Sequence, residues 1–102
     1  MDREESLKLV ESIRLMDYIV EYKLGPKEFR ILLIMAITRM RSPREISIRT
    51  RQPVGSVRVM FQTLRAKGFI EMDIDTEHEA WPKYSLSDLG RNLIFRILHP
   101  HA

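Results

Sequence analysis

The chain has 102 residues, with 17 Lys plus Arg against 14 Asp plus Glu, a formal net charge of +3. Its length fits one domain, 1–102, and 44% hydrophobic with 30% charged residues is a globular composition. No apolar run approaches the roughly 20 residues of a membrane span, and the acidic start is unlike a signal peptide. The lack of cysteine excludes disulfides and thiolate zinc sites, so we expect a small cytoplasmic domain.

The charge is concentrated in the middle of the chain. Residues 1–22 carry three basic and six acidic side chains, net −3, and residues 69–102 carry the same numbers. Residues 23–68 carry eleven basic and two acidic side chains, net +9. A basic block between acidic flanks indicates a surface for a polyanion, although an ordinary solvated face is the alternative.

Helical periodicity predicts a first helix over residues 3–23, within an N-terminal segment 1–24. It carries one apolar stripe and a weaker second apolar face. The stripe is Leu9, Ile13, Met16 and Val20, and the weaker face is Leu7, Leu15, Tyr18 and Tyr22. Gly25 and Pro26 end this helix.

A second helix is predicted from about Pro26 to Met40. Its expected inward stripe is Phe29, Leu32, Leu33, Ala36, Ile37 and Met40. Ile31, Ile34 and Met35 make the helix apolar on the other side as well. A helix that is apolar nearly all round must be covered, by the first helix, by a partner chain or by both.

Two shorter helices follow. Ser42, Pro43 and Glu45 are typical of a helix start with a capping box, and this helix should end near Thr50. The next helix, about 54–67, should have an inward face and close at a glycine. These residues are Val57, Met60, Phe61, Leu64 and Gly68.

After Gly68 the period changes to two, because Ile70, Met72 and Ile74 alternate with acidic residues. This predicts a half-buried strand, a loop over 75–82 and a returning strand over 83–87. A last helix, 88–98, completes the chain. Two helices joined by a short turn and followed by a hairpin make a winged helix-turn-helix.

Residues 42–71, SPREISIRTRQPVGSVRVMFQTLRAKGFIE, resemble the helix-turn-helix and first wing strand of MarR-like and PadR-like regulators. Their Leu-x-x-x-Gly-hydrophobic-Ile-Glu pattern falls on Leu64 to Glu71, and residues 84–91, YSLSDLGR, are similar to their entry into the last helix. The resemblance covers about 26–98. It implies an α+β, mainly α fold: a winged helix-turn-helix core over 26–87, a two-stranded wing, an extra N-terminal helix and a C-terminal helix.

A basic helix of this length fits the major groove of B-DNA. The residues of the 54–67 helix that should face outward are Gly55, Ser56, Arg58, Val59, Gln62, Thr63 and Arg65. Arg58 suits a guanine edge, Gln62 an adenine edge, and Val59 a thymine methyl. A solvated helix face is the alternative, but an outward Val59 would then need another explanation, such as a partner surface.

Phosphate contacts are expected from the short helix and the turn. The candidates are Arg41, Ser42, Arg44, Arg49 and Arg51. In the resembled families the start of this helix lies against a phosphate, and a helix N-terminus attracts anions. Arg51 replaces the glycine that these families often have in the turn.

The wing departs from the resembled families, which often carry Arg or Lys at its tip. Here the residues Glu71, Asp73, Asp75, Glu77 and Glu79 are acidic and alternate. Because phosphates repel acidic groups, we expect the wing to be held away from DNA, and contact with a basic partner is the alternative. The alternation could also indicate a metal site, but we expect one solvent face, because the loop lacks the ligand order of a calcium loop. Trp81 is expected to be a lid on the small core, and a stacking platform is the alternative. No cofactor, no small-molecule ligand and no enzyme activity are expected, since no Gly-rich phosphate loop or catalytic constellation is present.

The resembled families dimerise through helices outside the motif. The residues expected to form a dimer here are Leu9, Ile13, Met16, Val20, Leu93, Ile94, Ile97 and Leu98. The sequence thus predicts a sequence-specific double-stranded DNA-binding regulator, homodimeric and nucleoid-associated. A winged-helix protein-interaction module is the alternative function. The excess of Arg over Lys suggests a thermophilic or archaeal source.

Overall fold

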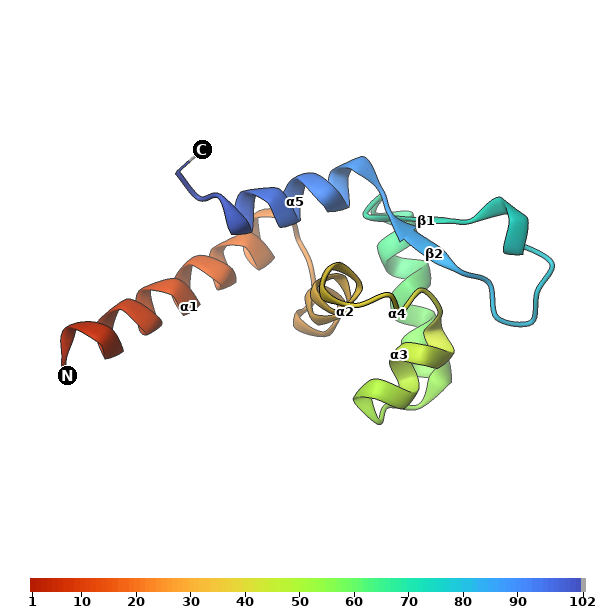
Figure 1. Cartoon of the computed structure of the whole chain (residues 1–102), viewed down its shortest axis with the longest axis horizontal. Coiled ribbons are helices and arrows are strands. Elements are labelled where there is room, and N and C mark those ends of the chain that lie inside the picture. The colour runs from red at the N-terminus through yellow and green to blue at the C-terminus, as the bar shows by residue number, and fades with distance from the viewer. Residues whose placement is uncertain (102) are drawn as a thin grey trace.

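The computed structural model describes residues 1–101, which fold into five helices and a two-stranded sheet (Figure 1). The elements are α1 (Arg3–Glu21), α2 (Pro26–Ile37), α3 (Pro43–Thr50), α4 (Val54–Ala66), β1 (Ile70–Met72), β2 (Tyr84–Leu86) and α5 (Asp88–Leu98). A 3₁₀ turn, Ile74–Thr76, follows β1. This order confirms the predicted winged helix-turn-helix with an added helix at each end. Within residues 1–101, no helix is both long and apolar enough to cross a membrane.

The core lies between α2, α4, the sheet and α5. The inward face of α4 is formed by Val57, Phe61 and Leu64, each of which is fully buried as predicted. Phe61 also meets Tyr84 of β2 edge to face, with ring centroids 5.1 Å apart. These contacts fix the outward face of α4 through packing within one chain.

Helix ends follow the predicted chemistry in part. The prediction that Gly25 and Pro26 end the first helix was wrong: α1 ends at Glu21, Lys23 takes the left-handed conformation, φ 55°, and Gly25 is the N-cap of α2. Ser42 accepts a hydrogen bond from the Glu45 amide at the start of α3, as expected of a cap. α2 ends at Ile37 instead of Met40, because Thr38 is extended and its hydroxyl donates to the Ile34 carbonyl. Ala36 and Ile37 lie on the surface, with Ile37 82% exposed, and the prediction that these two residues face inward was wrong.

The wing is an antiparallel hairpin in which Ile70 pairs with Leu86 and Met72 with Tyr84. β1 is shorter than predicted: the chain turns away after Met72, so Ile74 is exposed rather than half-buried. Two glycines allow this junction to close. Gly68 has φ +86°, and a Cβ at Gly90 would overlap the Phe69 carbonyl oxygen against which α5 packs.

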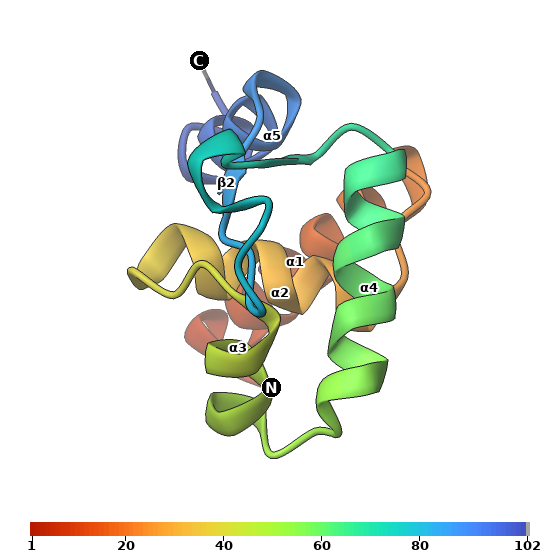
Figure 2. The ribbon, with the colours of Figure 1, turned by 90° about the vertical axis from the view of Figure 1, so that its right-hand side faces the viewer.

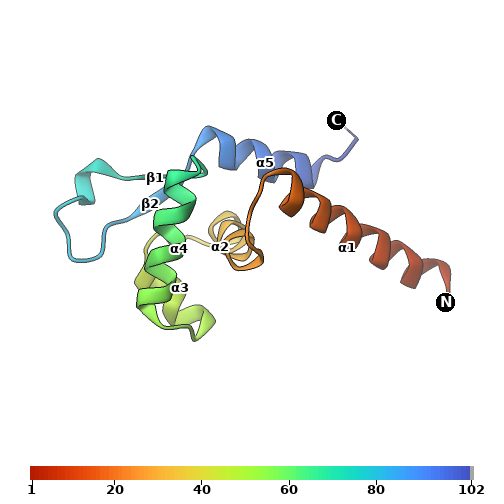
Figure 3. The same ribbon diagram turned by 180° about the vertical axis from the view of Figure 1, so that it is seen from behind.

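α1 projects from the body and touches it only near its C-terminal end, where α5 crosses it (Figure 3). Tyr18 is its one buried residue, and the Tyr18 hydroxyl donates to the Arg96 carbonyl. Arg96 in turn donates to Glu21 and Tyr22, and these hydrogen bonds, Glu21 first, raise its pKa above the usual value. The radius of gyration, 15.0 Å, exceeds the roughly 13 Å typical of this length because α1 stands apart.

Candidate nucleic-acid interface

The outward face of α4 is open to solvent. Of the seven residues predicted to face outward, Thr63 alone is half-buried, with its hydroxyl donating to the Val59 carbonyl. The exposed six are Gly55, Ser56, Arg58, Val59, Gln62 and Arg65. Val59 is 59% exposed, so this face offers an apolar contact between its polar groups.

The short helix α3 and the turn add cations beside α4, and the two helices lie side by side (Figure 2). Arg44, Arg49 and Arg51 are exposed, whereas Arg41 is half-buried. Arg51 has φ 55°, a left-handed conformation that explains why a glycine suits this turn. We call Arg44, Arg49, Arg51, Arg58 and Arg65 the arginine surface.

Ser42 departs from its predicted role as a phosphate contact. It is only 4% exposed, and its hydroxyl both accepts from the Glu45 amide and donates to the Glu45 carboxylate. The side chain is therefore used to begin α3, and we remove it from the candidate interface. The same capping that identified Ser42 in the sequence is what buries it.

None of the arginines of the arginine surface forms an ion pair within residues 1–101. The cations that do pair with carboxylates lie elsewhere: Lys8, Lys67, Arg91 and Arg96, besides His78. Glu45, the exposed acid of α3, accepts instead from the Arg41 amide and the Ser42 hydroxyl. The positive charge of this surface is thus not neutralised by the described chain, and it favours an anionic partner.

Trp81 lies between the wing and the arginine surface. The Arg58 Cζ atom is 5.0 Å from the centroid of its ring, and the Arg44 Cζ atom is 5.8 Å away. The ring is half-buried by these contacts and does not belong to the packed core. The prediction of a lid on the core was wrong, because the wing loop carries Trp81 to the two arginines instead.

The acidic residues of the wing have different surroundings. Asp73 accepts a hydrogen bond from the Ser85 hydroxyl, 2.7 Å, and so helps to hold the hairpin. Asp75, Glu77 and Glu79 are exposed, as expected of a solvent face, and the Glu77 carboxylate lies 3.2 Å from the His78 imidazole. Within residues 1–101, no three His, Asp or Glu side chains are grouped closely enough to hold a metal ion.

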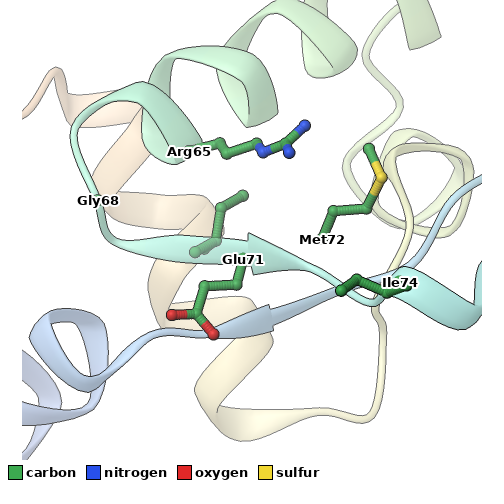
Figure 4. A pocket seen from close by; sticks show the side chains of 6 residues that line it. Arg65, Gly68, Glu71, Met72 and Ile74 are labelled. Carbon is green, nitrogen blue, oxygen red and sulfur yellow. The ribbon is translucent and has the colours of Figure 1, made fainter. Parts of the chain in front are cut away.

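A hollow of about 470 Å³ separates the end of α4 from β1 (Figure 4). Arg65 borders it from the α4 side, and Met72 and Ile74 border it from the wing side. The Glu71 carboxylate points away from Arg65, so Arg65 stays free of an acidic partner. The hollow therefore leaves Arg65 available at the edge of the arginine surface.

The other predicted surface is apolar and lies at the opposite end of the molecule. The whole stripe of α1 is exposed: Leu9 51%, Ile13 59%, Met16 64% and Val20 76%. Instead, the weaker face, with Leu15, Tyr18 and Tyr22, packs on the body. Leu98 is also exposed, while Leu93 is fully buried in the core and is removed from the candidate dimer surface.

A second apolar feature is a groove of about 330 Å³ between α2 and α5. It is lined by Leu33, Ala36, Ile37, Ile94, Ile97 and Leu98. Ile37 was missed as a surface residue because the periodicity of α2 placed it on the inward face. Phe95, 55% exposed on α5, was missed as well; its position two residues after the buried Leu93 is the signal that would have found it.

No protein-family model and no curated protein sequence matches this chain. Solved structures do: Tm0710, a transcriptional regulator from Thermotoga maritima, matches with a TM-score of 0.74 and 14% identity, over 93% of this chain and 66% of that one. S. aureus MepR in complex with DNA matches with a TM-score of 0.70 and 14% identity, over 93% of this chain and 75% of that one. Wild-type apo MarR from E. coli matches with a TM-score of 0.67 and 16% identity, over 98% of this chain and 76% of that one. The chain therefore has the winged-helix fold of MarR-type regulators, and it spans just under two thirds of Tm0710.

Proposed function

We propose that this protein is a transcriptional regulator that binds double-stranded DNA as a homodimer, with α4 in the major groove. The observation that carries the proposal is the arginine surface, because five exposed guanidinium groups gather on α3, the turn and α4 without an acidic partner in the described chain. A solved neighbour of the same fold, MepR, is in a complex with DNA. Phosphates supply the matching negative charge.

The arginine surface divides by position into base-reading and backbone-binding parts. Arg58 and Gln62 lie on the outward face of α4, where a bidentate contact to a guanine and to an adenine edge is chemically suited. Val59 between them can touch a thymine methyl. Arg44, Arg49 and Arg51 lie beside α4 and are assigned to phosphates, which fix orientation without reading sequence.

A second copy of the chain is the proposed occupant of the apolar surface. The stripe of α1 and the groove between α2 and α5 expose aliphatic side chains that a monomer would leave in water. A two-fold dimer would bring two α4 helices to one face, where successive major grooves lie about 34 Å apart. The proposed operator is accordingly two-fold symmetric.

A protein-interaction module is the second candidate. Ile48, 71% exposed on α3, and Val59 give this side of the molecule apolar groups, and the wing beside it is acidic. Acidic groups are repelled by phosphates but attract a basic protein. This candidate predicts no affinity for duplex DNA at low salt.

A titration with duplex DNA at several salt concentrations tests the proposal. The logarithm of the association constant should fall linearly with the logarithm of the salt concentration, with a slope of about −0.9 for each phosphate neutralised. The three arginines assigned to phosphates would give a slope of roughly −2.7 for one protomer and roughly −5.4 for the proposed dimer. Undetectable binding at low salt would eliminate DNA as the partner and leave the protein-interaction module.

Selection of bound sequences from random duplexes then tests specificity and symmetry together. A two-fold symmetric consensus with half-sites one helical turn apart supports the homodimer. An enriched but asymmetric single half-site would contradict it, and no enrichment would reduce the role of α4 to phosphate binding.

A further inference from the structure

Trp81 lies where the wing meets both helices of the helix-turn-helix. Arg44 comes from the first turn of α3 and Arg58 from α4, and both guanidinium carbons lie within 6 Å of the Trp81 ring centroid. This is the range in which a cation is attracted to the ring face. One aromatic side chain of the wing thus joins two helices that carry the arginine surface.

The wing holds Trp81 in place through its own hydrogen bonds. The Asp73 amide donates to the Lys83 carbonyl, 2.8 Å, and the Lys83 amide donates to the Thr76 hydroxyl, 2.9 Å. The Tyr84 amide donates to the Arg41 carbonyl, 2.7 Å, which ties β2 to the segment before α3. Trp81 therefore sits on a loop that is closed on itself and anchored to the body.

Contact with a ring face leaves the hydrogen-bonding edge of Arg58 unused. A cation over an aromatic ring is attracted by the charge distribution of the ring and needs no hydrogen bond to an oxygen or nitrogen atom. Within residues 1–101, no hydrogen bond or ion pair occupies the Arg58 guanidinium. The contact with Trp81 can therefore restrict the side chain without consuming the donors that a guanine would accept.

We propose that Trp81 is a positioning residue that holds Arg58 in place for base recognition, so that the wing contributes to sequence specificity without touching DNA. The proposal rests on the proposed DNA-binding function. A flexible arginine loses side-chain entropy when it binds, and restricting it beforehand lowers that cost. The acidic wing tip is compatible with this role, because the wing acts through Trp81 and its charges can remain away from phosphates.

The test compares Trp81 variants on the selected duplex and on a scrambled duplex. Trp81→Ala should lower the preference for the selected duplex by about two- to five-fold, the range of one exposed cation–ring contact. Trp81→Phe keeps a ring face and should retain most of the preference, whereas Trp81→Leu should lose it as Trp81→Ala does. Because no charge is removed, the salt slope should stay unchanged.

Coupling to Arg58 separates positioning from a general structural effect. In an Arg58→Ala background, Trp81→Ala should have no further effect on the preference, whereas in an Arg49→Ala background its full effect should remain. Additive effects in the Arg58→Ala background would overturn the proposal. So would a Trp81→Leu variant that discriminates as well as the wild-type chain.

Trp81 is the one tryptophan of the chain, so its fluorescence reports on the contact without DNA. Emission of the free protein should change in Arg58→Ala and stay unchanged in Arg49→Ala; no change in either would overturn the contact itself. If the wild-type chain binds no duplex at low salt, the proposed function fails and the role of Trp81 fails with it. Binding without coupling to Arg58 refutes the role of Trp81 alone.

Discussion

The arginine surface and the exposed aliphatic residues of α1 and α5 lack different kinds of partner. α4 is fixed by three fully buried side chains of its own chain, Val57, Phe61 and Leu64, and it exposes cations. α1 buries Tyr18 alone and exposes a row of aliphatic side chains. The first surface is fully positioned but lacks a charge partner, whereas the second lacks half of its packing.

The two surfaces therefore require partners of different chemistry. Attraction between guanidinium groups and phosphates is screened by salt, whereas burial of aliphatic surface is not. High salt should therefore release DNA while leaving the proposed dimer intact. The two surfaces lie at opposite ends of a molecule 52 Å long, so each can be altered separately.

The largest expected effect comes from a charge in the middle of the α1 stripe. Ile13→Glu should convert the proposed dimer to a folded monomer, because an unpaired carboxylate would be buried in the proposed interface. DNA affinity should fall by roughly 100-fold or more, since two linked half-site contacts become one. Sedimentation and duplex titration measure the two effects.

Leu7→Glu is the matched control, because it replaces another exposed aliphatic side chain, 54% exposed, with the same charge on the opposite face of α1. It should leave both the mass and the affinity close to those of the wild-type chain. A monomeric Ile13→Glu chain that binds the full operator undiminished would show that the two surfaces are not linked through a dimer.

The next effect compares two arginines of the arginine surface. Arg58→Ala should cost about 1–3 kcal/mol on the selected duplex and relax the preference at one base pair, because it removes a base contact. Arg49→Ala should weaken binding alike on all sequences and reduce the salt slope of the proposed dimer by about 1.8, because it removes one proposed phosphate contact from each protomer. Competition titrations with single-base variants of the operator distinguish them, and an equal loss on all sequences from Arg58→Ala would reassign it to a phosphate.

Local patterns in the sequence predicted the winged helix-turn-helix well. Period and capping residues located α1, α3, α4 and α5, and the change of period after Gly68 located the hairpin. The inward face of α4 also followed from its spacing. These features are decided within a few residues of the chain, where helix and strand periodicity act.

Features set by tertiary contacts were harder to predict. Periodicity gave α1 two apolar faces but not which of them packs on the body, and the weaker face does so. Leu93 and Ser42 were assigned to surfaces although both are buried. The contact of Trp81 with Arg58 joins residues far apart in the sequence, and only the path of the wing loop brings them together.

The smallest expected effect concerns the backbone beneath the arginine surface. Arg51→Gly should raise the free energy of unfolding by about 0.5–1 kcal/mol. Glycine adopts the left-handed conformation without the Cβ penalty, and this gain is partly offset by the greater entropy of glycine in the unfolded chain. The substitution should also reduce the salt slope of DNA binding by about 1.8, because each protomer of the proposed dimer loses one cation that is assigned to a phosphate. Lys23→Gly is the control: Lys23 shares φ 55° but lies between α1 and α2, away from the arginine surface. Denaturation at one fixed protein concentration should show the same stabilisation in both variants, and duplex titration should show the lower slope in Arg51→Gly alone. A lower slope in both variants would mean that the slope depends on the total charge of the chain. That result would contradict the claim that the two surfaces can be altered separately.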